Sequence, residues 1–208
     1  MIQKRILFAL FIWVLCQEIH SQDFQIKSPN ENLKLKVHID EGISWSAFLK
    51  EEVVLNKVRV GMDFLKGQDF GANPKVKAHR TKEYASIIYP TVPHKDAKIK
   101  DEFTELSITF KGNYILNFRA YNDGVAYQFI DKGRTRRKVK SEQLSLALPE
   151  GSRSLFPEEK SMYSHNERSY IDKSLPEISA EEFCSLPVLF VTENASVLFT
   201  ETALHDYP

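Results

Sequence analysis

Three alternating segments joined by two short turns, within residues 106–130, constrain the fold of this chain more than any other feature. In each segment apolar residues such as Leu106 and Ile108 occupy every second position, with polar residues between them. Side chains alternate between the two faces of a sheet, so this pattern is typical of strands with one buried face. Residues 111–113 and 122–124 separate the segments, and the Asp-Gly pair in the second turn is expected to supply the positive φ of a tight hairpin. The sequence therefore predicts a three-stranded β-meander.

The same alternation recurs along most of the chain, while residues 66–73 and 154–178 look irregular and residues 76–89 are ambiguous apart from a strand near 84–89. About ten short strands separated by turn signals, with no convincing amphipathic helix, predict an all-β antiparallel sandwich. The further predicted strands are 33–39, 43–49, 53–55, 58–64, 144–148, 186–191 and 197–200.

The charge balance argues against a nucleic-acid partner. Lys and Arg together number 28 and Asp and Glu together also number 28, so there is no net positive field to attract a polyanion. Residues 132–140 hold a cluster of basic side chains, but no aromatic residues alternate with them to stack on bases. We interpret that cluster as a solvated strand or loop face.

The first 21 residues differ from the rest. Lys4 and Arg5 precede an apolar run over 6–16, and a short polar stretch then ends at Ser21. A basic start, an apolar run of roughly 7–15 residues and a small residue before the cut are typical of a secretory signal peptide. The run is shorter than the about 20 apolar residues of a membrane span, so no stable membrane insertion is expected. We predict a signal peptide over 1–21, one domain over 22–208, and export to the periplasm or cell envelope of a Gram-negative bacterium.

Two cysteines bear on this interpretation. Lipidation of Cys16 is the alternative to cleavage after Ser21, but the bulky Leu15 precedes it where a small residue is expected. Cys184 is then the only thiol of the mature chain and has no internal disulfide partner. Its apolar neighbours indicate a buried small side chain and not a nucleophile.

Residues 118–129 carry a resemblance to a known family. This stretch resembles the hairpin signature in the N-terminal domain of glycoside hydrolase family 97, with Gln128 where the family often has Arg. The turn at 28–30, followed by two strands, is similar to the opening of the same domain. The resemblance covers most of residues 22–208 and implies a β-supersandwich of the galactose-mutarotase type, placed ahead of a (β/α)8 catalytic barrel.

The resemblance also implies a function. The chain would belong to an exported bacterial α-glucosidase or α-galactosidase acting on an oligosaccharide or polysaccharide, and its partner would be the C-terminal catalytic barrel of the same full-length chain. Two carboxyl groups perform glycoside hydrolysis, and in this family both lie in the barrel, so the chain alone is expected to be inactive and its stereochemical course stays open. Strand-like residues continue to Leu204, close to Pro208. We therefore expect a piece of a longer protein, with a sandwich that lacks its last strands.

Glu167 is the one candidate site residue. Residues 163–170 resemble the family segment that sends a Glu into the barrel to help bind Ca2+, with Glu167 at the ligand position. Ca2+ takes six to eight oxygen ligands, so one carboxylate would be a single contribution. From the residues alone, a surface carboxylate beside Arg168 is the alternative. Ser164 and His165 are adjacent and point apart on an extended chain, so they predict no catalytic pair.

Other polar and aromatic residues have simpler interpretations. Arg119 is expected to pair with an acid, and residues 122–124 are explained by turn geometry. Trp45, Tyr121 and Tyr127 could stack on a sugar, although strand aromatics more often pack in a core.

Two further functions fit the same pattern. One is a stand-alone exported carbohydrate-binding module, which soluble-glycan binding by the isolated chain would favour. The other is an adhesin-like or chaperone-like sandwich, which peptide addition to an exposed edge strand would favour.

Overall fold

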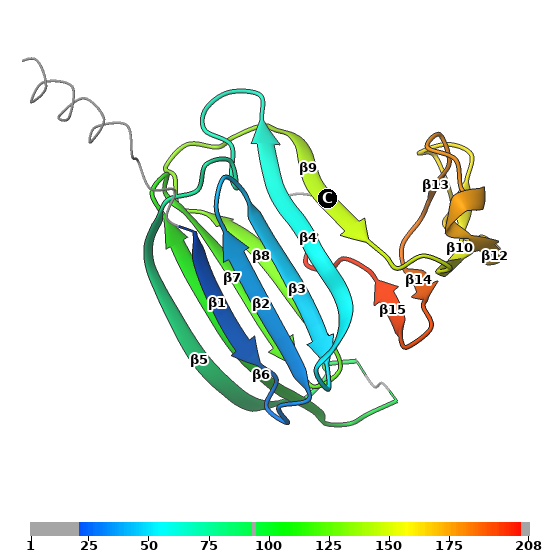
Figure 1. Cartoon of the computed structure of the whole chain (residues 1–208), viewed down its shortest axis with the longest axis horizontal. Coiled ribbons are helices and arrows are strands. Elements are labelled where there is room, and N and C mark those ends of the chain that lie inside the picture. Colours follow the sequence, from blue (N-terminus) through cyan, green and yellow to red (C-terminus); the bar gives the residue numbers. More distant parts are fainter. Residues whose placement is uncertain (1–20, 93–94, 205–208) are drawn as a thin grey trace, which may run out of the picture.

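The computed structural model describes residues 21–92 and 95–204, and Figure 1 shows a two-sheet β-sandwich beside a smaller β-lobe. The first sheet of the sandwich has the order β1-β2-β3-β4-β9, and the second, behind it in Figure 1, has the order β5-β6-β7-β8. All paired neighbours are antiparallel. The strands are β1 (Gln22–Lys27), β2 (Leu33–Ile39), β3 (Ile43–Leu49), β4 (Glu52–Phe64), β5 (Val76–Ile88), β6 (Ile99–Phe110), β7 (Tyr114–Tyr121), β8 (Val125–Asp131) and β9 (Val139–Ala147).

The β-lobe follows β9 and contains two small sheets, of order β12-β10-β14-β15 and β11-β13. Its elements are β10 (Arg153–Phe156), β11 (Glu158–Glu159), β12 (Ile171–Ser174), the 3-10 helix η1 (Leu175–Glu177), β13 (Phe183–Cys184), β14 (Val188–Val191) and β15 (Ser196–Phe199). Within residues 21–92 and 95–204, no helix is both long and apolar enough to cross a membrane. The predicted signal peptide falls almost wholly outside the described residues.

The hydrophobic core lies between the two sheets of the sandwich. Alternate residues of β2, β3, β6 and β7 supply it, and Leu35, Ile108 and Leu116 are each fully buried. Trp45 of β3 meets Phe118 of β7 in an edge-on contact with ring centroids 6.5 Å apart, which joins the sheets across the core. The all-β antiparallel sandwich predicted from the sequence is therefore confirmed.

Three sequence predictions need correction. The meander is confirmed as β6, β7 and β8, but the described residues contain fifteen strands instead of about ten. The segments predicted at 53–55 and 58–64 form one continuous strand, β4. The ambiguous stretch at 76–89 is the 13-residue strand β5, whose side chains are almost all exposed. Alternation is absent there because β5 is held by backbone pairing to β6 at the edge of the sheet, without burying one face.

The two turns of the meander differ from expectation. Gly112 has a φ of +116° and Asn113 a φ of +61°, so the first turn uses the left-handed region. Residues 122–124 show no such backbone angle, and the Asp-Gly prediction was wrong on this point. The second turn is closed instead by the Tyr121 N–H, which donates to the Gly124 carbonyl at 2.8 Å.

Most of the basic cluster at 132–140 lies in the connection between β8 and β9, and its last member, Lys140, belongs to β9. Arg137 folds back onto the sandwich, where its guanidinium lies 3.1 Å from Asp131 and about 5 Å from the ring centres of Phe64 and Phe70. Its terminal nitrogen also donates to the Gln68 carbonyl at 3.0 Å. Arg137 therefore holds the β8–β9 connection against the sandwich, so the cluster is not solely a solvated face.

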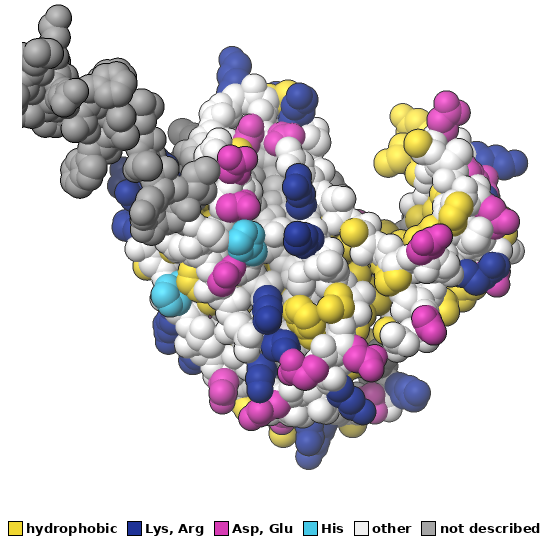
Figure 2. Space-filling model, viewed as in Figure 1, with side chains coloured by type: hydrophobic (Ala, Val, Ile, Leu, Met, Phe, Trp, Pro, Cys, Tyr) yellow, Lys and Arg dark blue, Asp and Glu magenta, His cyan; other side chains and the backbone are white. Residues whose placement is uncertain are grey.

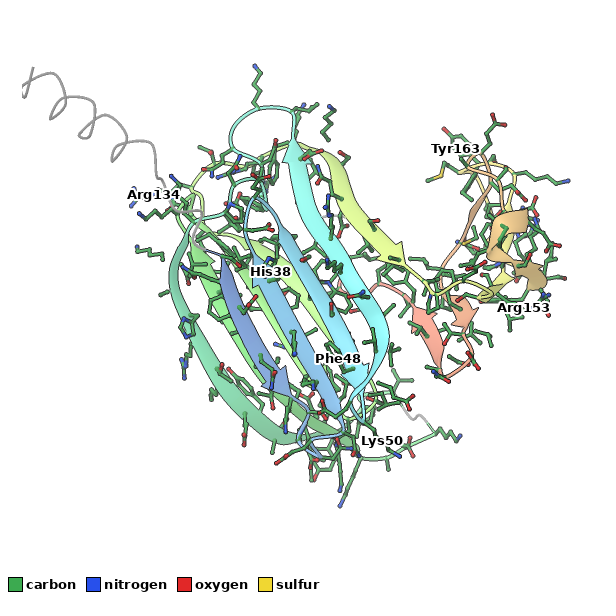
Figure 3. The ribbon with its side chains drawn as sticks, viewed as in Figure 1. His38, Phe48, Lys50, Arg134, Arg153 and Tyr163 are labelled. Atoms are coloured by element: carbon green, nitrogen blue, oxygen red, sulfur yellow. The ribbon has the colours of Figure 1, made fainter. Side chains whose placement is uncertain are left out.

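The outer face of the first sheet mixes basic and acidic side chains, as Figure 2 shows. His38 lies there on β2, as labelled in Figure 3, between Asp23 of β1 at 2.6 Å and Asp40 of the following turn at 3.3 Å. The hydrogen bond with Asp23 outweighs partial desolvation and raises the pKa of His38 above 6.5. The protonated imidazole thus ties the edge strand β1 to its neighbour.

The His38 contacts predict a pH-dependent stability. Because the pKa is raised by folding, the contribution of His38 is fully present below the unfolded value and is lost as the pH rises through the folded value. The side chain is almost half exposed, so solvent screening limits the effect. We expect His38→Gln to lower the free energy of unfolding by roughly 0.5 kcal/mol at acidic pH and by much less at alkaline pH. Urea unfolding at pH 5.5 and 8.5 checks this, and equal losses at both would contradict it.

Candidate functional site

The candidate site is built around the connection from β11 to β12, residues 160–170, which we call the Glu167 loop. The loop occupies one end of the β-lobe, where Figure 3 labels Tyr163 well away from β15. Tyr163 is 97% exposed and its neighbour Met162 is 86% exposed. The apex of the loop is therefore unpacked in this chain.

A buried carboxylate lies at the base of the loop. Glu159 of β11 has a side chain only 4% exposed, and its Oε1 accepts hydrogen bonds from the Ser164 hydroxyl at 2.6 Å and from the Ser185 hydroxyl at 3.2 Å. Its Oε2 accepts from Arg168 Nε at 2.8 Å. The bonds from Ser164 and then Arg168 lower the pKa of Glu159, so the carboxylate is held in its charged form.

A second ion-pair group lies beside this base. Lys173 of β12 donates to Glu158 at 2.7 Å and also to Glu182. Its hydrogen bond to Glu158, followed by the one to Glu182, raises the pKa of Lys173. Glu158 and Glu159 are adjacent in the two-residue strand β11 and therefore point to opposite sides, toward different partners.

Glu167 itself projects from the loop into solvent. Its backbone N–H donates to His165 Nδ1 at 3.2 Å, and the preceding Asn166 has a φ of +58°, a conformation that Asn tolerates. Its carboxylate has no hydrogen-bond or ion-pair partner in the described part of the chain, because Arg168 turns to Glu159 instead. Both carboxylate oxygens are thus free to accept a ligand from outside.

The residues present suit one ligand of a calcium ion and not a whole site. Carboxylate oxygens are the donors that Ca2+ prefers, and six to eight oxygens are needed. Across residues 21–92 and 95–204, no group of three or more His, Cys, Asp or Glu side chains is placed to hold a metal. Glu167 fits a calcium site only if another chain segment or domain supplies the remaining ligands.

The other candidate residues have structural roles. Arg119 pairs with Glu105 at 2.8 Å, which identifies the acid that the sequence could not name. Asn122 accepts a hydrogen bond from the Asn30 backbone N–H at 2.9 Å and so ties together the two turns that carried the family resemblance. Burial raises the pKa of the half-buried Cys184 thiol, which agrees with a structural cysteine.

The three aromatic candidates also occupy structural positions. Trp45 is in the core, Tyr127 donates to Glu142 at 2.6 Å, and Tyr121 lies beside Phe103 with ring centroids 5.0 Å apart.

Sequence reasoning missed the role of Glu159. The residue follows Pro157 and Glu158 in a stretch with no alternation, and nothing in the local pattern marks one of two adjacent acids as buried. The available signal was weak, namely the concentration of Ser, Asn, Glu and Arg just downstream, which is where partners of a buried carboxylate must come from.

Comparison with known proteins identifies the family and the fold. A family model described as "Glycosyl-hydrolase 97 N-terminal" matches residues 26–208. The chain is 25% identical over 216 residues to a retaining alpha-galactosidase of Bacteroides thetaiotaomicron, covering 99% of this chain and 32% of that protein. The chain therefore spans about a third of the length of its curated relative.

Solved structures share the fold. The crystal structure of a β-arabinopyranosidase superposes with a TM-score of 0.76 at 23% identity, covering 88% of this chain and 32% of the other. A glycoside hydrolase family 97 enzyme from Pseudoalteromonas sp. strain K8, in complex with acarbose, gives a TM-score of 0.71 at 17% identity, covering 82% and 27%. With the family model matching nearly the whole described chain, the protein belongs to the N-terminal domain family of the family 97 glycoside hydrolases.

Proposed function

We propose that this chain is the N-terminal domain of an exported glycoside hydrolase that acts on α-linked galactosides or glucosides. In this proposal it packs against a (β/α)8 catalytic barrel of the same full-length protein, and Glu167 supplies one carboxylate to a Ca2+ ion held mainly by that barrel. The retaining alpha-galactosidase named above supports the substrate class, since 99% of this chain aligns with about a third of that enzyme.

The observation that carries the proposal is the free carboxylate of Glu167. The adjacent Arg168 is committed to Glu159 and does not pair with Glu167. The loop is instead anchored below Glu167, which leaves the carboxylate available at the surface. Bound Ca2+ would provide positive charge near the substrate, while this chain would provide only one of its oxygen ligands.

The surface of the lobe supports a large partner. Met162 and Tyr163 are adjacent at the apex of the Glu167 loop and are 86% and 97% exposed, so a partner that meets Glu167 would also cover apolar surface. Figure 2 shows a hollow between the sandwich and the β-lobe with apolar side chains gathered at its floor. A folded domain seated there would cover this surface. The signal-peptide pattern of residues 1–21 supports export.

The first test is the reading frame that encodes the chain. Sequencing beyond the codon for Pro208 should find a frame that continues into a barrel pattern with catalytic carboxylates. A stop codon at that point would instead favour a stand-alone carbohydrate-binding module.

The second test is Glu167→Gln in the protein that this frame encodes. We expect the Ca2+ concentration for half-maximal hydrolysis of an aryl α-galactoside or α-glucoside to rise by about tenfold or more, on the scale seen when metal-site groups are removed. Glu181→Gln, at another exposed acid of the β-lobe, is the matched control and should leave this concentration unchanged. An unchanged Ca2+ dependence in Glu167→Gln would refute the role of Glu167.

A further inference from the structure

We infer that Glu159 is a positioning residue, whose buried carboxylate holds the Glu167 loop in the one conformation that presents Glu167 to its partner. The inference rests on the proposed function for its purpose, but its geometry is independent of that function. It assigns a role to a second acid, eight residues before Glu167, that never touches the ligand itself.

Glu159 contacts residues that flank Glu167 on both sides in the sequence. Ser164 lies three residues before Glu167 and Arg168 directly after it, and both donate to the same carboxylate, one to each oxygen. Ser185, from the segment after β13, donates to the same oxygen as Ser164. A single buried group therefore joins the two arms of the loop to the body of the lobe.

Little else fixes the loop. In the described chain, no hydrogen bond between two backbone groups involves residues 160–170, so no ladder holds it. Its apex is unpacked, since Met162 and Tyr163 are nearly fully exposed. The remaining contacts of Ser161, Asn166 and Glu167 are local and span two residues each. Apart from the bonds to Glu159, the one contact in the described residues that leaves the loop is made at its end by Tyr170, whose hydroxyl donates to the Pro187 carbonyl at 3.1 Å.

The Ser164 hydroxyl extends the effect of Glu159 to the backbone next to Glu167. Its oxygen accepts the Asn166 N–H at 2.9 Å while its own proton goes to Glu159. Asn166 is the residue in the left-handed conformation, which sets the direction of the chain as it enters Glu167. Loss of the Glu159 charge weakens the bond that orients this hydroxyl, because hydrogen bonds to an ionised acceptor are about twice as strong as neutral ones.

The test is amide hydrogen exchange of the 208-residue protein, comparing wild type with Glu159→Gln. We expect exchange of the Tyr163, Asn166 and Glu167 amides, which donate to Ser161, Ser164 and His165 within the loop, to accelerate by about tenfold, while β2, β3, β6 and β7 keep their protection, because local opening is governed by local contacts. Glu158→Gln is the matched control. This variant makes the same chemical change one residue away, but the Glu158 side chain pairs with Lys173 and not with the loop. Exchange in the loop should therefore stay as in wild type.

Further readouts separate positioning from general stability. Ser164→Ala removes one of the two loop bonds to Glu159 and also the acceptor of the Asn166 N–H, so its readout is the Tyr163 and Glu167 amides, whose exchange should accelerate even if Glu159→Gln fails to fold. In the protein carrying the catalytic domain, Glu159→Gln should raise the half-saturating Ca2+ concentration severalfold and leave the rate at saturating Ca2+ nearly unchanged.

The outcomes also distinguish the two proposals. Unchanged loop exchange in both Glu159→Gln and Ser164→Ala would overturn the inference. Faster loop exchange in these variants, together with an unaffected Ca2+ dependence in Glu167→Gln, would support the positioning role and refute the proposed function.

Discussion

Replacing Phe118 by Ala should remove about 3–5 kcal/mol from the free energy of unfolding, the usual cost of truncating a buried Phe to Ala. Phe118 is 1% exposed and lies on β7 in the middle of the second sheet. It contacts Trp45 on the opposite sheet and Tyr127 on the adjacent strand, with ring centroids 6.5 and 6.4 Å away. The cavity left behind cannot collapse easily, because both neighbours are fixed in their own strands. Urea denaturation followed by Trp fluorescence measures the loss.

The matched control is Phe48→Ala. Phe48 lies on the outer face of β3 and is partly exposed, with the ammonium groups of Lys34 and Lys36 4.9 and 5.2 Å from its ring centre. We expect this variant to lose about 1 kcal/mol or less, because little apolar surface returns to water. Equal losses for the two variants would contradict the placement of the core between the sheets.

Gly71→Ala should be similarly damaging, for a different reason. Gly71 has a φ of +86°, and a Cβ at this position would lie 2.9 Å from the Val60 carbonyl oxygen. Its N–H also donates to the buried Tyr114 hydroxyl at 3.3 Å. Backbone strain of about 1–3 kcal/mol and overpacking of about 1–3 kcal/mol should add, so we expect a loss of roughly 4 kcal/mol in unfolding free energy.

Gly67→Ala separates these two contributions. Gly67 has a comparable φ of +100°, but nothing lies within 4 Å of a Cβ built there. This control should lose only the strain term, roughly 1–2 kcal/mol. If thermal or urea unfolding gave the two variants the same stability, the close approach of residue 71 to β4 would be wrong.

The sequence predicted those parts of the fold that local patterns encode. The meander was predicted correctly because β6 and β7 each bury one face, so that apolar side chains such as Ile108 and Leu116 recur at every second position. β5 could not be delimited in this way. Its register comes from pairing with β6, and backbone pairing leaves no trace in side-chain type.

The candidate site also has one residue that local sequence indicated and one that it did not. Glu167 was found through the resemblance of its neighbours to a family segment, and the fold class and family were confirmed. Its role as a Ca2+ ligand stays a prediction. Glu159 could not be found, because its burial depends on β11 pairing with β13 across more than twenty residues of chain. Contacts between distant segments decide which of two adjacent acids points inward, and one sequence does not report them.

The strand order of the first sheet has a consequence for how the chain assembles. β4 pairs with β9, yet the entire second sheet, residues 76–131, lies between them in the chain. During synthesis from the N-terminus, β1 to β4 can pair locally, while the free side of β4 waits for a strand made much later. Closing so long a loop is slow, and an unpaired strand side is a template for other chains. Concentration-dependent aggregation should therefore be greatest in the interval before residues 139–147 dock on β4.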